Sequence, residues 1–149
     1  MDQHQSEIGD RVALRALVDA YARAVDHADV AAVVALFAPD GRLVAHAGGG
    51  DPLVRAGQRE ITDALTQGLA RYATTTHVVG GQVVGFDGDG ASGETTCLAH
   101  HVYDGAGGRR LLVMAVRYVD HYVRLDRGWH FAQRELHFDW RDDRPVGER

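Results

Sequence analysis

Three polar side chains of this sequence have the types and spacing needed to move a proton. Asp26 ends an apolar helical stripe at residues 11–26, and His77 stands among β-branched residues in the stretch TTTHVVGG. A carboxylate can hold an imidazole in one tautomer, so that its other nitrogen acts as a general base. A second imidazole, from the adjacent pair His100 and His101, would then supply the acid.

The sequence alone leaves open which histidine of that pair joins the trio. His100 and His101 are neighbours in an expected strand, so their side chains must point to opposite faces of a sheet. Both faces of the strand carry apolar side chains: Leu98 and Val102 on one, and Cys97, Ala99 and Tyr103 on the other. Alternation therefore does not select between them.

Helices that would position these residues are expected mainly in the first half of the chain. Apolar periodicity predicts them at residues 11–26, 30–38 and 57–72. Asp10 and Asp29 are candidate N-caps of the first two, and Pro39 is suited to end the second. A short strand at residues 42–47 and a glycine-rich loop at residues 48–52 are expected before the third helix.

The second half is expected to form four long antiparallel strands. Valine, threonine and aromatic residues alternate between glycine–aspartate turns, which predicts strands at residues 75–86, 91–103, 109–125 and 128–140. Helices combined with such strands indicate an α+β domain whose bent sheet wraps around the first helix. An apolar pocket between them is a common small-ligand site. We expect one domain over residues 1–149, with a core at about 10–140 and polar tails.

Composition and charge argue against several classes of protein. A formal charge of -5 and a pI near 5.9 argue against nucleic-acid binding, which depends on clustered basic residues. No apolar run approaches the roughly 20 residues that span a membrane, and no signal peptide is evident, so no membrane association and a cytoplasmic location are expected. Cys97 is the single cysteine, which excludes an internal disulfide and a cysteine-cluster metal site.

Four stretches of the chain resemble the SnoaL-like branch of the nuclear transport factor 2-like superfamily, and in particular the scytalone dehydratases: YARAVDHADVAAVVALFAPDG, TTHVVGG, AHHVYD and YVRLDRGWHFA. The resemblance implies a cone-shaped α+β barrel, with three N-terminal helices packed on a strongly bent, mainly antiparallel sheet. It assigns Asp26 and His77 to the family's catalytic aspartate and first histidine. It also selects His100 as the second histidine and sends His101 to the other face.

The chain departs from those dehydratases where they hold the substrate carbonyl. Val25 and Ala45 stand at the positions of two tyrosines that polarise the carbonyl through water, and Tyr118 stands at the position of a pocket asparagine. The acid–base trio is therefore expected to act on a different substrate. The residues expected to form the substrate-binding wall are Tyr118, Val25, Met114, Val116, Leu136 and Phe138.

These features predict a lyase of the dehydratase type, or an isomerase, that needs no cofactor and acts on a small apolar cyclic or polyketide-like molecule. His77, oriented by Asp26, would be the base and His100 the acid. The alternative is a non-catalytic ligand-binding or assembly domain of the same fold, which the loss of both tyrosines favours.

A metal centre is a further alternative, because Asp26, His77 and His100 make a 2-His-1-carboxylate set. The chain has no HExxH or similar local spacing, so no metal is expected. The resemblance implies a homodimer or homotrimer assembled through the outer face of the sheet, with contacts from residues such as Asp120. Arg134 and Glu135 are expected to form a surface ion pair or to lie at the lip of the sheet.

Overall fold

The computed structural model describes residues 3–147, and the side chains of residues 6–147. Its elements follow the order α1 (Gln3–Asp26), α2 (Val30–Ala35), β1 (Phe37–His46), β2 (Leu53–Ala56), α3 (Gly57–Leu69), β3 (Thr74–Asp87), β4 (Gly90–Gly105), β5 (Gly108–Leu125) and β6 (Gly128–Pro145). No helix in this described range is long and apolar enough to cross a membrane.

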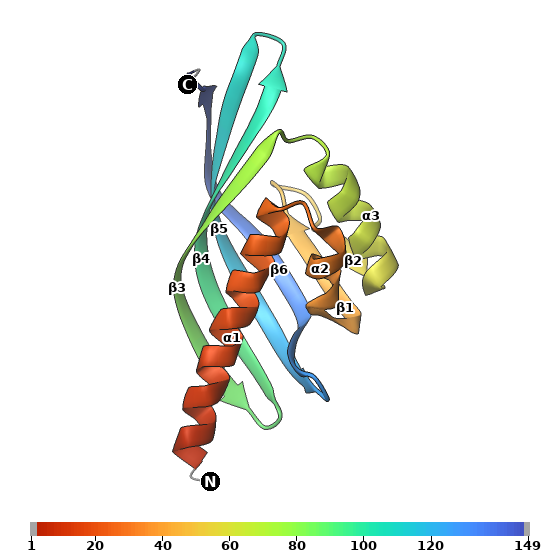
Figure 1. Cartoon of the computed structure of the whole chain (residues 1–149), viewed down its shortest axis with the longest axis vertical. Helices are drawn as coiled ribbons and strands as arrows, with labels where there is room; N and C mark the ends of the chain where they lie inside the picture. Colours follow the sequence, from red (N-terminus) through yellow and green to blue (C-terminus); the bar gives the residue numbers. More distant parts are fainter. Residues whose placement is uncertain (1–2, 148–149) are drawn as a thin grey trace.

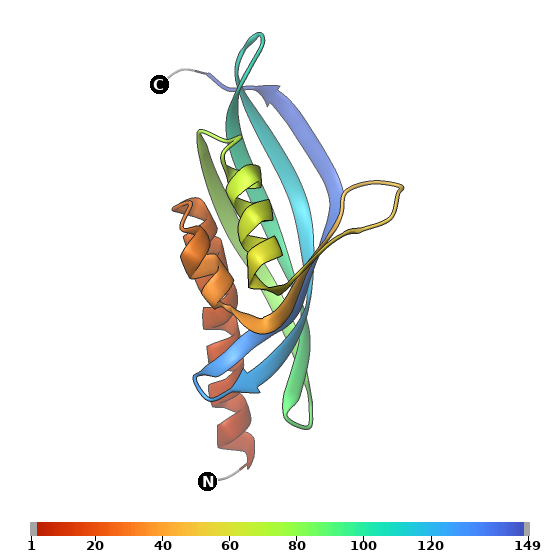
Figure 2. The same cartoon turned by 90° about the vertical axis from the view of Figure 1, so that its right-hand side faces the viewer.

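The strands form one mixed sheet in the order β2-β1-β6-β5-β4-β3. Strands β1 and β6 pair in parallel, and the other neighbours pair antiparallel. The sheet bends along its length, and all three helices lie on the same side of it (Figures 1 and 2). The predicted α+β class, with a bent and mainly antiparallel sheet, is confirmed. A pocket lies between the hollow side of the sheet and the helices.

Helix α1 buries the apolar stripe that predicted it, including Leu14, Val18 and Tyr21. It begins at Gln3, well before the predicted start, so the predicted cap at Asp10 is wrong. The Asp10 carboxylate instead accepts hydrogen bonds from Arg124 at 2.6 Å and from the Trp129 indole at 3.0 Å.

The region between α1 and α3 differs in part from the prediction: the short strand expected at residues 42–47 overlaps the longer β1, but α2 is shorter than expected and a further strand, β2, precedes α3. Helix α2 begins at its predicted cap, because the Asp29 side chain accepts from the backbone N–H of Ala32 at 3.0 Å. It ends at Ala35, and two strands, β1 and β2, precede α3. Strand β1 starts early because Phe37, only 1% exposed, packs as a strand residue beside Phe131. Strand β2 was not predicted, since four residues are too few to show a period.

A buried ion pair crosses the core beneath α1. Arg134 donates to the two oxygens of Asp120 at 2.9 and 3.0 Å, and both side chains are 0% exposed. The guanidinium lies over the rings of Tyr21, Tyr118 and Phe131, with 3.8 Å to the Tyr118 ring centre. The predicted surface position of Arg134 and outer-face position of Asp120 are therefore wrong: both side chains project from their strands into the core.

Candidate active site

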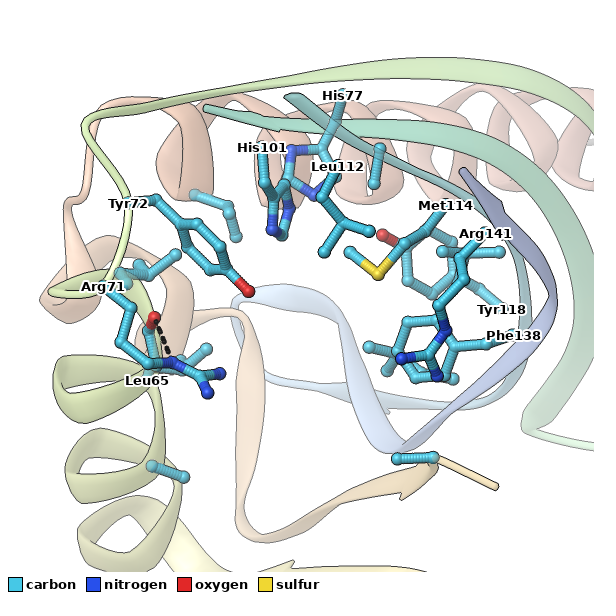
Figure 3. A pocket seen from close by; sticks show the side chains of 18 of the residues that line it. Leu65, Arg71, Tyr72, His77, His101, Leu112, Met114, Tyr118, Phe138 and Arg141 are labelled. Atoms are coloured by element: carbon cyan, nitrogen blue, oxygen red, sulfur yellow. Dashed lines mark hydrogen bonds between the residues drawn. The ribbon is translucent and has the colours of Figure 1, made fainter. Parts of the chain in front are cut away.

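A pocket of about 480 Å³ lies between helices α1 and α3 and the hollow face of the sheet (Figure 3). Its wall is mostly apolar. All six side chains expected to bind substrate lie on this wall: Tyr118, Val25, Met114, Val116, Leu136 and Phe138. They come from α1, β5 and β6, so the wall is assembled from segments far apart in the sequence.

Asp26 is the last residue of α1 and reaches strand β3. Its Oδ1 accepts from Nδ1 of His77 at 2.6 Å and from the hydroxyl of Thr75 at 2.9 Å. Its Oδ2 accepts from the backbone N–H of His77 at 2.9 Å. Ala28, with a φ of 52°, turns the chain in the left-handed conformation that commonly ends a helix, so α1 stops with Asp26 beside β3.

These hydrogen bonds keep Asp26 ionised although it is partly buried. Burial raises the pKa of Asp26, but the hydrogen bonds from the ring and backbone of His77 and from Thr75 outweigh burial and hold the pKa below its usual range. An ionised carboxylate only accepts hydrogen bonds, so Nδ1 of His77 must carry the proton. The other ring nitrogen, Nε2, then has its lone pair free, and it has no hydrogen-bond partner among the described residues. His77 lines the pocket with a side chain only 6% exposed.

The second histidine of the pocket is His101, and the assignment of His100 is wrong. In the pairing of β3 with β4, His77 stands opposite Ala99, and His101 lies two residues further along on the same face. His100 stands opposite Thr76 on the other face, where its Nδ1 lies 3.3 Å from the Thr76 carbonyl oxygen. His100 does not line the pocket, so the proposed metal set of Asp26, His77 and His100 is not assembled.

His101 is buried in an environment that disfavours its charged form. Its ring lies 4.3 Å from that of Tyr72, edge to face, and 5.5 Å from that of His77. Neither ring nitrogen has a hydrogen-bond partner in the described part of the chain. Burial and the neighbouring charge of His77 lower the pKa of His101 to about 4. At neutral pH it is therefore an uncharged imidazole with an N–H that can donate a hydrogen bond to a ligand.

The sequence model of the SnoaL-like domain matches residues 6–135 of the chain. The protein belongs to the SnoaL-like family. One relative of this SnoaL-like domain is an uncharacterized protein of Mycobacterium tuberculosis, 30% identical over 130 residues, which are 87% of this chain and 85% of the relative.

Solved structures show the same fold. A proposed aromatic ring hydroxylase from Novosphingobium aromaticivorans is 28% identical, with a TM-score of 0.78 over 89% of this chain and 91% of the other. A proposed scytalone dehydratase from the same organism is 20% identical, with a TM-score of 0.83 over 97% and 94%. A hexachlorocyclohexane dehydrochlorinase from Novosphingobium barchaimii is 16% identical, with a TM-score of 0.80 over 95% and 94%. The resemblance seen in the sequence is thus confirmed at the level of family and fold.

Three polar residues of this SnoaL-like pocket were missed in the sequence. The Tyr72 hydroxyl points toward the cavity beside His101, and Arg71 and Arg141 stand at opposite sides of it (Figure 3). Neither arginine forms an ion pair with a described carboxylate, although the protein as a whole is acidic. The sequence pattern did not indicate these residues, because Arg71 and Tyr72 come after the end of α3 and Arg141 lies beyond the predicted end of the last strand.

Proposed function

We propose that the protein is a lyase or isomerase that needs no cofactor and removes a proton from a small, largely apolar molecule in the pocket. The observation that carries the proposal is the Asp26–His77 pair at the pocket wall, with Nδ1 of His77 held at 2.6 Å from the carboxylate. This arrangement leaves Nε2 as the base. Relatives of this fold that include a proposed dehydratase and a dehydrochlorinase support an elimination.

In the proposed reaction His77 takes a proton from a carbon next to a carbonyl or a similar activating group. The ionised Asp26 stabilises the imidazolium that forms. Neutral His101 and the Tyr72 hydroxyl donate hydrogen bonds to the oxygen on which negative charge develops. The imidazolium then returns its proton to a leaving hydroxyl, which departs as water, or to another carbon, which completes an isomerisation. The acid expected at His100 is thus replaced by His77 itself in its protonated form.

The walls of the pocket support a cyclic or polyketide-like substrate with one polar edge. Side chains from β5 and β6 provide apolar surface for a ring, among them Leu112, Met114 and Phe138. Arg71 and Arg141 add two positive charges that no described carboxylate neutralises. We therefore favour a substrate that carries an acidic hydroxyl or a carboxylate on the side away from the reacting carbon.

The experiment that tests proton removal does not require the natural substrate. A panel of small cyclic hydroxyketones and phenolic acids is incubated with the protein in deuterated water, and deuterium uptake and loss of water are followed by mass spectrometry. His77→Gln and Asp26→Asn are each expected to slow exchange by about 10²- to 10⁴-fold. His100→Ala, on the opposite face of β4, is the matched control and should keep the wild-type rate.

Near-wild-type exchange in both pocket variants would end the proposal. A panel compound that binds the wild-type protein tightly but neither exchanges nor reacts would instead support the non-catalytic ligand-binding alternative.

A further inference from the structure

A second histidine–carboxylate cluster lies on the opposite face of the same sheet. Along β6, Leu136 and Phe138 point into the pocket, so the alternating Glu135 and His137 point outward. Strand β1 runs parallel to β6 and places His46 directly beside His137. The two imidazole rings stack with 4.2 Å between their centres and 13° between their planes.

The three side chains converge on one point. Nε2 of His46 and Nε2 of His137 lie 3.0 and 3.2 Å from the same oxygen, Oε2 of Glu135. All three potential ligand atoms lie within 4.8 Å of one another. In a tetrahedral zinc site with bonds of about 2.0–2.1 Å, ligand atoms are about 3.3 Å apart. The two nitrogen-to-oxygen distances are already close to this separation, so small side-chain rotations would suit the cluster to an ion.

The surroundings of Glu135 suit a metal ligand. Gln133 donates to its other oxygen, Oε1, at 2.7 Å, which orients the carboxylate and leaves Oε2 for the cluster. The hydrogen bond from His46, helped by that from His137 and opposed by burial, holds the pKa of Glu135 below its usual range. Binding would move each imidazole proton from Nε2 to Nδ1, which has no described partner in either ring.

We propose that His46, Glu135 and His137 form a binding site for one divalent transition-metal ion of the zinc class. The three side chains are 33%, 24% and 29% exposed, so solvent completes the coordination. The ion joins the parallel strands β1 and β6 on the face away from the pocket, and its role is to stabilise that pairing. This site is independent of the proposed reaction.

The test uses the full chain without a polyhistidine tag, treated with a chelator and then titrated with Zn²⁺ by calorimetry. Thermal unfolding is followed with and without the ion, and Co²⁺ absorption reports the coordination. We expect one ion per chain and a higher unfolding temperature with Zn²⁺. His46→Ala, His137→Ala and Glu135→Gln should each weaken binding by at least about 10- to 100-fold, and Gln133→Ala by a smaller factor.

Two controls separate this site from ordinary histidine binding and from the pocket. His121 stands opposite Gln133 on the outer face but outside the cluster, so His121→Ala should bind as the wild type does. His77→Gln should also bind unchanged. Unfolding temperatures in chelator identify any variant that has lost its fold, and Glu135→Gln keeps the size of the side chain. Absence of Zn²⁺ binding, binding that survives His46→Ala and His137→Ala, or loss of binding in His77→Gln would each overturn the proposal.

Discussion

Asp26 and Asp120 are two interior carboxylates that each bind a nitrogen base. Only the base bound by Asp26 can exchange a proton with a ligand. Asp120 grips Arg134 through two hydrogen bonds in a core where both side chains are 0% exposed. Asp26 grips His77 at the wall of a pocket, where Asp26 is 22% and His77 6% exposed. Arginine keeps its proton at every accessible pH, whereas histidine exchanges its proton near neutrality.

The contrast shows why one interior pair of a carboxylate and a nitrogen base can transfer a proton whereas the other only stabilises the fold. The hydrogen-bond distances, 2.6 Å for His77 and 2.9 and 3.0 Å for Arg134, all show a direct hydrogen bond, so the presence of that bond does not distinguish the pairs. What differs is the proton affinity of the base and its contact with space for a ligand. Arg134 is covered by the rings of Tyr21, Tyr118 and Phe131, while the second nitrogen of His77 has no partner among the described residues.

The largest expected effect is on catalysis by the pocket pair. His77→Gln should lower the rate on any substrate of the panel by about 10²- to 10⁴-fold, because it removes the base. The free energy of unfolding should change little in comparison, since the amide can still donate to Asp26. Rate measurements paired with urea denaturation would reveal this separation. If His77→Gln lowered the free energy of unfolding but not the rate, the Asp26–His77 pair would be structural and not catalytic.

The core pair should show the opposite behaviour. In Arg134→Met the buried Asp120 carboxylate keeps the hydrogen bond from the Tyr122 hydroxyl but has no cation beside it, so the free energy of unfolding should fall by about 3–5 kcal/mol. The double variant Arg134→Met/Asp120→Leu should recover most of that loss, because it removes both charges. Urea denaturation at neutral pH measures both. Arg117→Met is the control: Arg117 and Asp139 are 39% and 40% exposed, so the loss of their solvent-screened ion pair should lower the free energy of unfolding far less.

The pocket should also make stability depend on pH through His101. Burial and the neighbouring charge of His77 lower the pKa of His101 from the usual 6.5 to about 4 in the folded chain. The unfolded chain therefore binds more protons between these values, and stability is lost as pH falls through this window. The contribution lost between about pH 7.5 and pH 5 is about 2 kcal/mol. Because the pKa of Asp26 is also lowered, its contribution is present above the usual pKa of 3.8 and is lost as pH falls further.

His101→Phe keeps an aromatic ring that cannot take up a proton. The wild type should therefore lose stability relative to this variant as pH falls from 7.5 to 5. A difference that stays constant across this range would show that His101 is not held neutral by burial.

The smallest effect should come from Thr75, which gives Asp26 one of its three hydrogen bonds. Thr75→Val keeps the shape of the side chain but removes that bond, and should cost about 0.5–1.5 kcal/mol. The rate on a panel substrate should fall by less than about tenfold, since both hydrogen bonds from His77 remain. A fall as large as that of His77→Gln would mean that Thr75 itself contacts the substrate.

Local pattern predicted much of this molecule. The apolar period of α1 located Asp26 at a helix end, and the turn signals located the four long strands. The family resemblance predicted that Asp26 and His77 belong to one site. The choice of His100 over His101 was wrong. Alternation shows only that the two side chains face opposite sides of the sheet, and the register of β3 with β4 determines which of them enters the pocket.

Other features required information that no local pattern contains. Arg134 and Asp120 were expected near the surface because charges are rarely buried, and in the core the charge of each is compensated mainly by the other. His46 meets His137 through a parallel pairing between segments about ninety residues apart, which leaves no trace in the period of either strand. Strand β2 was too short to give a period.

The central claim is that Asp26 fixes the tautomer of His77 and so frees Nε2 as a base. Nitrogen-15 NMR of the histidine rings tests this most directly, with the His77 signals identified by their loss in His77→Gln. In the neutral form of the ring we predict a protonated Nδ1 and an unprotonated Nε2. A neutral ring with its proton on Nε2 would contradict the account, because the nitrogen available to a substrate would then have no lone pair to accept a proton.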